Sequence, residues 1–365
     1  MKSKNQLAKA LSVYTLGLIL PLKMMSQDIH FSQINQNASL INPALTGASH
    51  VLSASLMYRD QWRTVASPYK TFGVNIESRL KNSGWNKVEN QSMTFTQQSY
   101  NRLAAGLSFY NDQAGDGNMG TSNINLSLAT FVKTGANSNL SLGLQGSMVQ
   151  KKVDINKLIF SNQYNGTTYD QSLNNGENSS ALSFIYPDFA GGLNWVYEIK
   201  DKMIASNFNR KANFGFAIYH INKPKNTYLA GNNSNLNMKY IFNGDFLIGI
   251  RNSNYAIAPA YLAQFQGKNV NIVAGSVLKY YIKEDSKYTG IIQRSSLNFG
   301  VFYRYKDAMI LSFSYDKRQQ YSVSVSYDVN VSGLNTVSKF SGGPEITLRY
   351  NTANAYLYQK KEKVE

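Results

Sequence analysis

The chain has 365 residues, with 37 lysines and arginines against 21 aspartates and glutamates, a formal net charge of +16, and no cysteine. The lack of cysteine excludes a disulfide framework, a thiol catalyst and a thiolate metal site. No uninterrupted apolar run reaches the length of a membrane-spanning helix, which excludes a helical membrane protein but not a β-barrel, whose alternating pattern averages out in a hydropathy window.

The first predicted element is a secretory signal peptide at residues 1–26. Three lysines within the first ten residues precede a short apolar core at 11–22, and the small Ser26 stands before Gln27. We therefore expect Sec export with cleavage near Ser26/Gln27, the alternative being an uncleaved anchor helix. Export argues against nucleic acid as the partner of this basic chain. Outer-membrane lipid or lipopolysaccharide headgroups and an acidic protein are the expected alternatives.

After a lead-in at residues 27–50, the first strand begins near Leu52. Its apolar side chains share one face and its polar ones the other, as a period of two requires. The strand ends in the run Tyr58-Arg59-Asp60-Gln61-Trp62. Parity places Tyr58 and Trp62 toward lipid, where amphipathic rings favour the interface, and Arg59 and Gln61 toward the lumen.

The same alternation recurs to the end of the chain, most clearly from Tyr321 to Ser332. Twelve alternating residues suit a tilted strand that crosses a bilayer, which needs roughly 9–11 residues. The sequence therefore predicts an all-β fold: one transmembrane antiparallel outer-membrane β-barrel of about fourteen strands at residues 51–353, with a polar tail at 354–365. A long strand in a soluble sandwich is the alternative for this stretch alone.

The connections indicate an orientation. The tight turns at 134–137, 252–254 and 317–319 fall on the side where both termini would lie, as expected of the periplasmic end of a barrel. The long polar connections at 153–186, 223–237 and 333–342 then lie outside. Residues 81–101 are expected to form a long loop on the periplasmic side, against this rule.

The lead-in at 27–50 shows no strand period and is rich in Asn, Gln and Ser. Pro43 favours extended backbone at Asn42, and Gly47 permits a turn. Because a barrel larger than eight strands leaves space in its lumen, we predict that this segment folds back as a plug whose amides satisfy inward polar groups. An open passive pore is the competing interpretation.

Motifs at both ends of the chain resemble the PorP/SprF family of outer-membrane proteins of the Bacteroidetes type IX secretion and gliding machinery. The matching residues at the N-terminal end are Phe31, Ser32, Gln33, Asn42, Pro43, Ala44, Gly47, Tyr58, Arg59, Gln61 and Trp62. Those near the C-terminus are Tyr327, Asp328 and Glu345 within their strands. The resemblance implies a role in secretion or surface retention of large adhesins, and other type IX secretion components as partners.

Catalytic and metal-binding patterns are weak. The three histidines, His30, His50 and His220, show no spacing that predicts a hydrolase triad. The run 111–118 offers oxygen ligands but lacks the spacing of an EF-hand loop, so a polar turn is the simpler interpretation. We expect no enzyme activity, no cofactor and no metal.

Charged residues that face the lumen are more informative. Parity places Arg59 and Glu77 inward on the first two strands, and Asp328, Glu345 and Arg349 inward on the last two. Closure of the barrel brings these strands together, so Arg59 can meet Glu345 or Asp328. Since an unpaired charge beside low-dielectric walls is costly, a structural clamp is favoured over a role in conduction.

The predicted function is a non-enzymatic accessory component of type IX secretion that assists the export or surface attachment of a large adhesin through the adhesin's C-terminal region. A plugged transporter or porin for small solutes and a purely structural barrel remain the alternatives. The inward faces read from the sequence, which carry Ser, Asn, Gly, Gln and charge, suit polar solutes better than fatty acids.

Overall fold

The structure is a computed structural model that describes residues 31–34, 36–62, 69–90, 93–115, 117–174, 176, 182–199, 209–228, 234–283, 294–333, 340–352 and 359–360. The chain divides into two compact units, Met1–His30 and Phe31–Glu365, and every described residue belongs to the second. The predicted signal peptide and cleavage site therefore lie outside the described residues.

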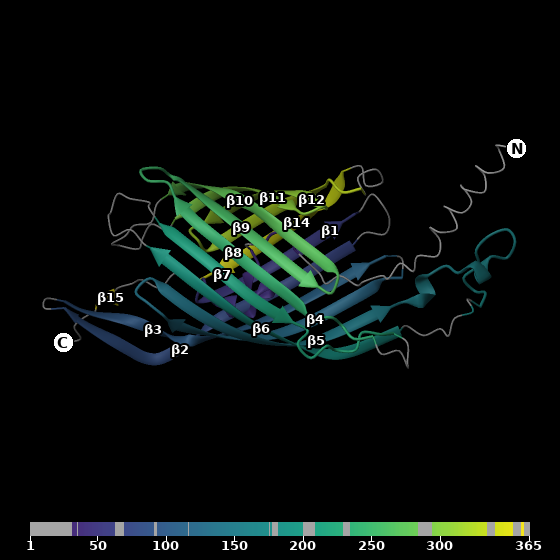
Figure 1. Cartoon of the computed structure of the whole chain (residues 1–365), viewed down its shortest axis with the longest axis horizontal. Helices are drawn as coiled ribbons and strands as arrows, with labels where there is room; N and C mark the ends of the chain where they lie inside the picture. The colour runs from purple at the N-terminus through teal and green to yellow at the C-terminus, as the bar shows by residue number, and fades with distance from the viewer. Residues whose placement is uncertain are drawn as a thin grey trace, which may run out of the picture. The chain divides into compact units, whose positions relative to one another are not determined.

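Within the described part of the second unit, 14 antiparallel strands form a closed barrel (Figure 1). The strands are β1 (Leu52–Gln61), β2 (Tyr69–Asn90), β3 (Met93–Ala114), β4 (Met119–Lys133), β5 (Ser138–Val153), β6 (Leu182–Ile199), β7 (Arg210–Tyr219), β8 (Lys239–Gly249), β9 (Tyr255–Gln266), β10 (Asn269–Lys283), β11 (Ser295–Arg304), β12 (Ala308–Lys317), β13 (Tyr321–Asn330) and β14 (Ser341–Asn351). Each strand pairs with the next in sequence, and the β1–β14 pairing closes the ring. The predicted fold class is confirmed.

Short helical turns complete the described elements. They are α2 (Ala38–Ile41), η1 (Pro43–Leu45), η2 (Ile155–Lys157) and η3 (Ser161–Gln163). Among the described residues, no helix has the length and apolar character needed to cross a membrane.

Strand β13 illustrates how the sequence specifies the barrel wall. Ser322, Ser324 and Ser326 are buried, whereas Val323 and Val325 are exposed. Apolar side chains therefore face outward and polar ones inward, the reverse of a soluble protein and the arrangement of a transmembrane barrel. The strand ends at Asn330, two residues before the predicted end, where the connection to β14 begins.

The lumen is less uniformly polar than the sequence indicated. Apolar side chains on the inward faces of β6 to β12 form one buried cluster with Ile34, and Ile41 packs against it. The wall members of this cluster are Ala190, Ala217, Tyr219, Ile241, Ala260, Leu262, Val273, Phe302 and Ile310. Two isoleucines from the lead-in thus cover the apolar side of the barrel interior.

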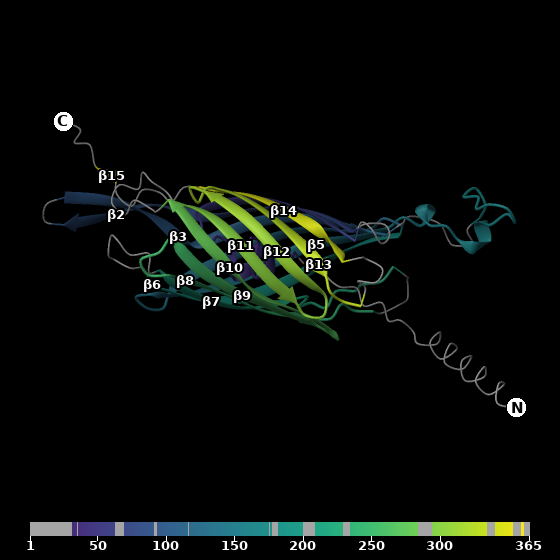
Figure 2. The ribbon, with the colours of Figure 1, turned by 90° about the horizontal axis from the view of Figure 1, so that it is seen from above.

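The prediction of a long loop at residues 81–101 is wrong. Strands β2 and β3, each of 22 residues, continue through this region as paired strands up to Asn90 and Met93 (Figure 2). The pairing reaches beyond the partners of the barrel wall, because β1 meets β2 only as far as Ser78 and β4 meets β3 from Leu103. A strand outside the wall needs no apolar face toward lipid, so the period-two signal is lost there. A two-residue strand, β15 (Gln359–Lys360), pairs with β3 in this hairpin.

Candidate functional site

The described N-terminal segment, residues 31–34 and 36–50, lies against inward-facing residues from strands on several sides of the barrel. Its first anchor is Glu345 of β14, whose carboxylate accepts hydrogen bonds from the backbone N–H groups of Ser32 at 2.7 Å and Gln33 at 3.1 Å. The Gln33 side-chain amide donates to Ser326 Oγ on β13 at 3.2 Å. Backbone and side chain of the segment are therefore both fixed to the same pair of strands.

A buried ionic cluster surrounds this anchor. Arg59 Nη2 lies 2.9 Å from Asp328 Oδ2, and Arg59 Nε lies 4.0 Å from Glu345. Arg304 of β11 also contacts Asp328, at 3.0 Å, and donates to Ser32 Oγ at 2.7 Å. The two arginines and two carboxylates compensate one another, as buried charges require, and Ser32 Oγ donates a further hydrogen bond to Asp328 at 2.8 Å.

The second anchor is the turn Asn42-Pro43-Ala44, the start of η1. The fully buried Asn42 amide donates to the carbonyls of Leu193 at 3.0 Å and Phe216 at 3.4 Å, while its oxygen accepts from Ala44 N at 3.0 Å. The same amide donates to Asn243 Oδ1 at 3.2 Å. One side chain thus caps its own helical turn and also binds strands β6, β7 and β8.

Glycines of the wall make room for this turn. A Cβ atom at Gly143 of β5 would overlap the backbone of Pro43 and Ala44, and one at Gly192 of β6 would overlap Asn42. A Cβ at Gly215 of β7 would lie 2.7 Å from the Asn42 amide nitrogen, also too close. These three inward positions form a glycine pocket, which receives the Pro43 and Ala44 backbone at Gly143 and the Asn42 side chain at Gly192 and Gly215.

The third anchor is the turn at Gly47, which has a φ of +65°. Gly47 N donates to Glu77 Oε2 at 3.2 Å, and Arg79 Nε donates back to the Gly47 carbonyl at 2.7 Å. Arg79 also donates to the Ala48 carbonyl at 3.0 Å, and Thr46 Oγ1 donates to Ser127 Oγ at 3.0 Å. A residue with a side chain would be strained at this φ, which explains why a glycine occupies position 47.

The remaining predicted residues take different places. Tyr58 and Tyr327 are exposed on the outside of the barrel, and Gln61 is half-buried. Trp62 has a φ of 59°, and its ring lies 5.2 Å from that of Tyr69 in an edge-on arrangement. Arg349 donates weakly to the Gln36 carbonyl at 3.4 Å, far along β14 from the ionic cluster at Glu345.

Sequence reasoning missed several residues that hold the segment. Arg304 could have been found, because it continues the inward parity of Ser296 and Asn298 along β11. Arg79 could have been placed in the lumen in the same way, because it continues the inward parity of Glu77 along β2. The partners of Arg79 and of the glycine pocket carried no local signal, because they depend on which part of the lead-in reaches them.

One histidine of the described residues contacts an acidic side chain. His220 Nδ1 lies 2.9 Å from Asp188 Oδ2, and both side chains are buried. His30 lies outside the described residues. Over the part of the chain that the structure describes, no group of three or more His, Cys, Asp or Glu residues could hold a metal ion.

A closed antiparallel barrel with an apolar exterior and a largely polar interior is an outer-membrane β-barrel. The chain matches the family of type IX secretion system membrane proteins PorP/SprF over residues 24–350. It therefore belongs to the PorP/SprF family, and other components of this secretion system are its expected class of partner.

A comparison with curated proteins gives no match. Among solved structures, an FadL homologue of Pseudomonas aeruginosa is similar with 11% identity and a TM-score of 0.41, covering 87% of this chain and 94% of that chain. BamA from Haemophilus ducreyi lacking POTRA domains 1–3 has 12% identity and a TM-score of 0.39, covering 82% and 70%. CdiB from Escherichia coli has 9% identity and a TM-score of 0.38, covering 82% and 63%. Similarity at this level carries no argument about function.

Proposed function

We propose that this protein is a non-enzymatic accessory component of type IX secretion that assists the export or surface attachment of a large adhesin by binding its C-terminal region. The observation that carries the proposal is the occupied lumen. Hydrogen bonds from the N-terminal segment reach β14 through Glu345, β8 through Asn243, β4 through Ser127 and β2 through Glu77. A polypeptide or solute would have to displace this segment to cross the barrel, so we assign the partner to a surface instead.

The connection between β5 and β6 supports a protein partner at the outer end. Its described part is held by its own polar groups: Gln163 Nε2 donates to the carbonyls of Gln171 at 3.4 Å and Leu173 at 3.2 Å. It exposes Tyr164 and Tyr169, whose ring centroids lie 5.2 Å apart. Exposed tyrosines on a preorganised loop suit protein binding, because little conformational entropy is lost on contact.

Export and lipid contact belong to the same proposal. We propose that residues 1–26 are removed near Ser26/Gln27 and that the exposed aromatic residues of the barrel contact outer-membrane lipid or lipopolysaccharide. Mass spectrometry of the amino terminus of the protein purified from outer membranes tests the cleavage: a mature chain that retains Lys2 to Lys23 contradicts it.

The experiment that tests the function is deletion of the gene, followed by surface labelling of secreted adhesins. We expect at least one large adhesin to be lost from the surface and restored by the wild-type gene. The double variant Tyr164→Ser/Tyr169→Ser should restore it poorly. The matched control Thr167→Ser/Thr168→Ser, in the same exposed connection, should restore it fully.

The chief rival is a plugged transporter for small solutes. If every large adhesin reaches the surface of the deletion strain and stays there, while uptake of a small polar solute fails, the secretion role is overturned in favour of the transporter.

A further inference from the structure

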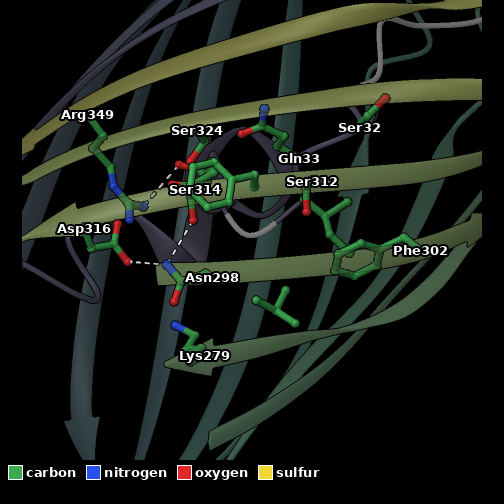
Figure 3. Close-up of a pocket in the computed structure, with 14 residues that line it drawn as sticks. Ser32, Gln33, Lys279, Asn298, Phe302, Ser312, Ser314, Asp316, Ser324 and Arg349 are labelled. Carbon is green, nitrogen blue, oxygen red and sulfur yellow. Dashed lines mark hydrogen bonds between the residues drawn. The ribbon is translucent and has the colours of Figure 1, made fainter. Parts of the chain in front are cut away.

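The N-terminal segment leaves one part of the lumen unfilled. A cavity of about 100 Å³ lies between Gln33 and Gln36 of the segment and the inward faces of β10 to β14 (Figure 3). A water molecule needs about 10–15 Å³ of such space, so the cavity can hold a small ion together with water.

Two cations from strands that are not neighbours face this cavity. Lys279 of β10 lines it, attracted by the charge of Asp316 and repelled by that of Arg349. Arg349 of β14 lines it from the other side; its Nη1 donates to the Gln36 carbonyl at 3.4 Å, and its Nε has no partner within the described residues. Two positive charges with so few partners are costly in a low-dielectric interior.

One carboxylate of the lining faces these two cations. It is Asp316, whose Oδ2 accepts from Asn298 at 2.7 Å and Ser296 at 3.3 Å. Charges farther off act in both directions: Asp245 attracts Lys279 and Lys211 repels it, while Glu77 attracts Arg349. The positive charge of the cavity lining therefore exceeds the negative charge by one, since Lys279 and Arg349 face a single carboxylate.

Two hydroxyl groups add donors at the same place. Ser314 Oγ accepts from Asn298 Nδ2 at 2.9 Å, so its own hydrogen is free to donate. Ser324 Oγ is buried and has no hydrogen-bond partner among the described residues. An ammonium, a guanidinium and two hydroxyls thus line one small space (Figure 3).

We propose that this cavity binds a small oxyanion, a carboxylate or a phosphate, between Lys279 and Arg349. Such an anion accepts several charge-assisted hydrogen bonds at once and compensates both cations. Unpartnered oxygens of Gln33, Gln36 and Asp316 also border the space and need donors, which accompanying water supplies. The bound anion links the N-terminal segment to the β10–β14 side of the barrel.

The test is thermal unfolding of the full-length protein in detergent, with acetate, phosphate or gluconate at equal ionic strength and pH. Acetate and phosphate are compact anions, whereas gluconate is a bulkier polyol, so the first two should raise Tm saturably, by about 2 °C relative to gluconate. The stronger of the two identifies the ligand as carboxylate or phosphate. Equal Tm in all three salts overturns the site, and this wild-type result does not depend on any variant folding.

Two substitutions locate the effect. Lys279→Gln and Arg349→Gln should each abolish the difference between acetate or phosphate and gluconate. Lys268→Gln, in the exposed turn between β9 and β10, is the matched control and should retain the difference. An anion effect that survives both cavity variants overturns the assignment.

Discussion

The two sides of the lumen hold the N-terminal segment in different ways. On the β5–β7 side, glycines let the backbone of Pro43 and Ala44 and the side chain of Asn42 touch the wall directly. On the β10–β14 side, side chains leave a cavity of about 100 Å³ bordered by unpartnered polar atoms. Close backbone contact fixes position because nothing can rotate away, whereas a hydrated space tolerates rearrangement. The glycine contact therefore positions Asn42 to Ala44 and the ionic cluster positions Ser32 and Gln33, whereas the cavity beside that cluster is the part that can adapt.

The largest effect is expected from filling the glycine pocket. Gly143→Val places side-chain atoms where the Pro43 and Ala44 backbone lies, and seating of the segment should become unfavourable by roughly 3 kcal/mol or more. We expect open-channel conductance in planar bilayers. Gly146→Val is the control on the same strand, since a Cβ there meets only the Phe189 ring at 3.9 Å. A Gly143→Val barrel without open-channel conductance would contradict the role of the glycine pocket in seating the segment.

The next effect is expected at the ionic cluster. Glu345→Gln removes the charge that accepts from Ser32 and Gln33 and leaves Arg59 with Asp328, at a cost of about 3 kcal/mol. Protease cleavage within the segment of the folded protein should become much faster. Asp307→Asn, which changes a partly exposed partner of Arg304, should cost less than about 1 kcal/mol. Equal cleavage rates for the two variants would argue against the cluster as an anchor.

A smaller effect is expected at Asn42. Asn42→Ala removes the amide that donates to the carbonyls of Leu193 and Phe216. Loss of this donor from the two carbonyl oxygens should make seating of the segment less favourable by about 1–3 kcal/mol. The segment should remain seated but exchange its amide hydrogens faster. Asn165→Ala, in the outer connection, should leave exchange in the segment unchanged; a change of equal size in both variants would show a global rather than a local effect.

The smallest effect is expected from pH at His50, which precedes β1. Burial first, and then the positive charges of Arg349 and Lys211, lower the pKa of His50 from 6.5 to about 4, with Asp316 opposing them. Because the seated state disfavours the proton, its stability is complete above pH 6.5 and falls as pH decreases toward 4. Protease sensitivity of the segment should increase modestly between pH 7.5 and pH 5. The increase should vanish in His50→Gln; persistence there would assign it to another group.

Most of the correct predictions from sequence came from the alternation of inward and outward side chains along each strand. Alternation identified the strands and the inward positions of Arg59, Asp328 and Glu345, because the pleat fixes the side of every second residue. The same rule would have placed Arg304 in the lumen. It failed at residues 81–101, where the strands leave the wall and no lipid-facing pattern is required.

The position of the N-terminal segment against the lumen wall could not be predicted in this way. Pro43 and Gly143 are about a hundred positions apart and share no period, so their contact depends on closure of the whole barrel. The cavity at Lys279 and Arg349 is space that remains unfilled where the N-terminal segment packs against the barrel wall. Local pattern contains no information about it.

The most direct test of the seated segment uses the absence of cysteine from the chain. Thr46 Oγ1 and Ser127 Oγ are 3.0 Å apart, so Thr46→Cys/Ser127→Cys should form a disulfide in the folded barrel under mild oxidation. Thr46→Cys/Thr130→Cys, whose second cysteine has the outward parity of β4, should not. Selective cross-linking of the first pair, read as a gel shift reversed by reductant, is the predicted result. A folded barrel in which neither pair cross-links would contradict the placement of this segment inside the lumen.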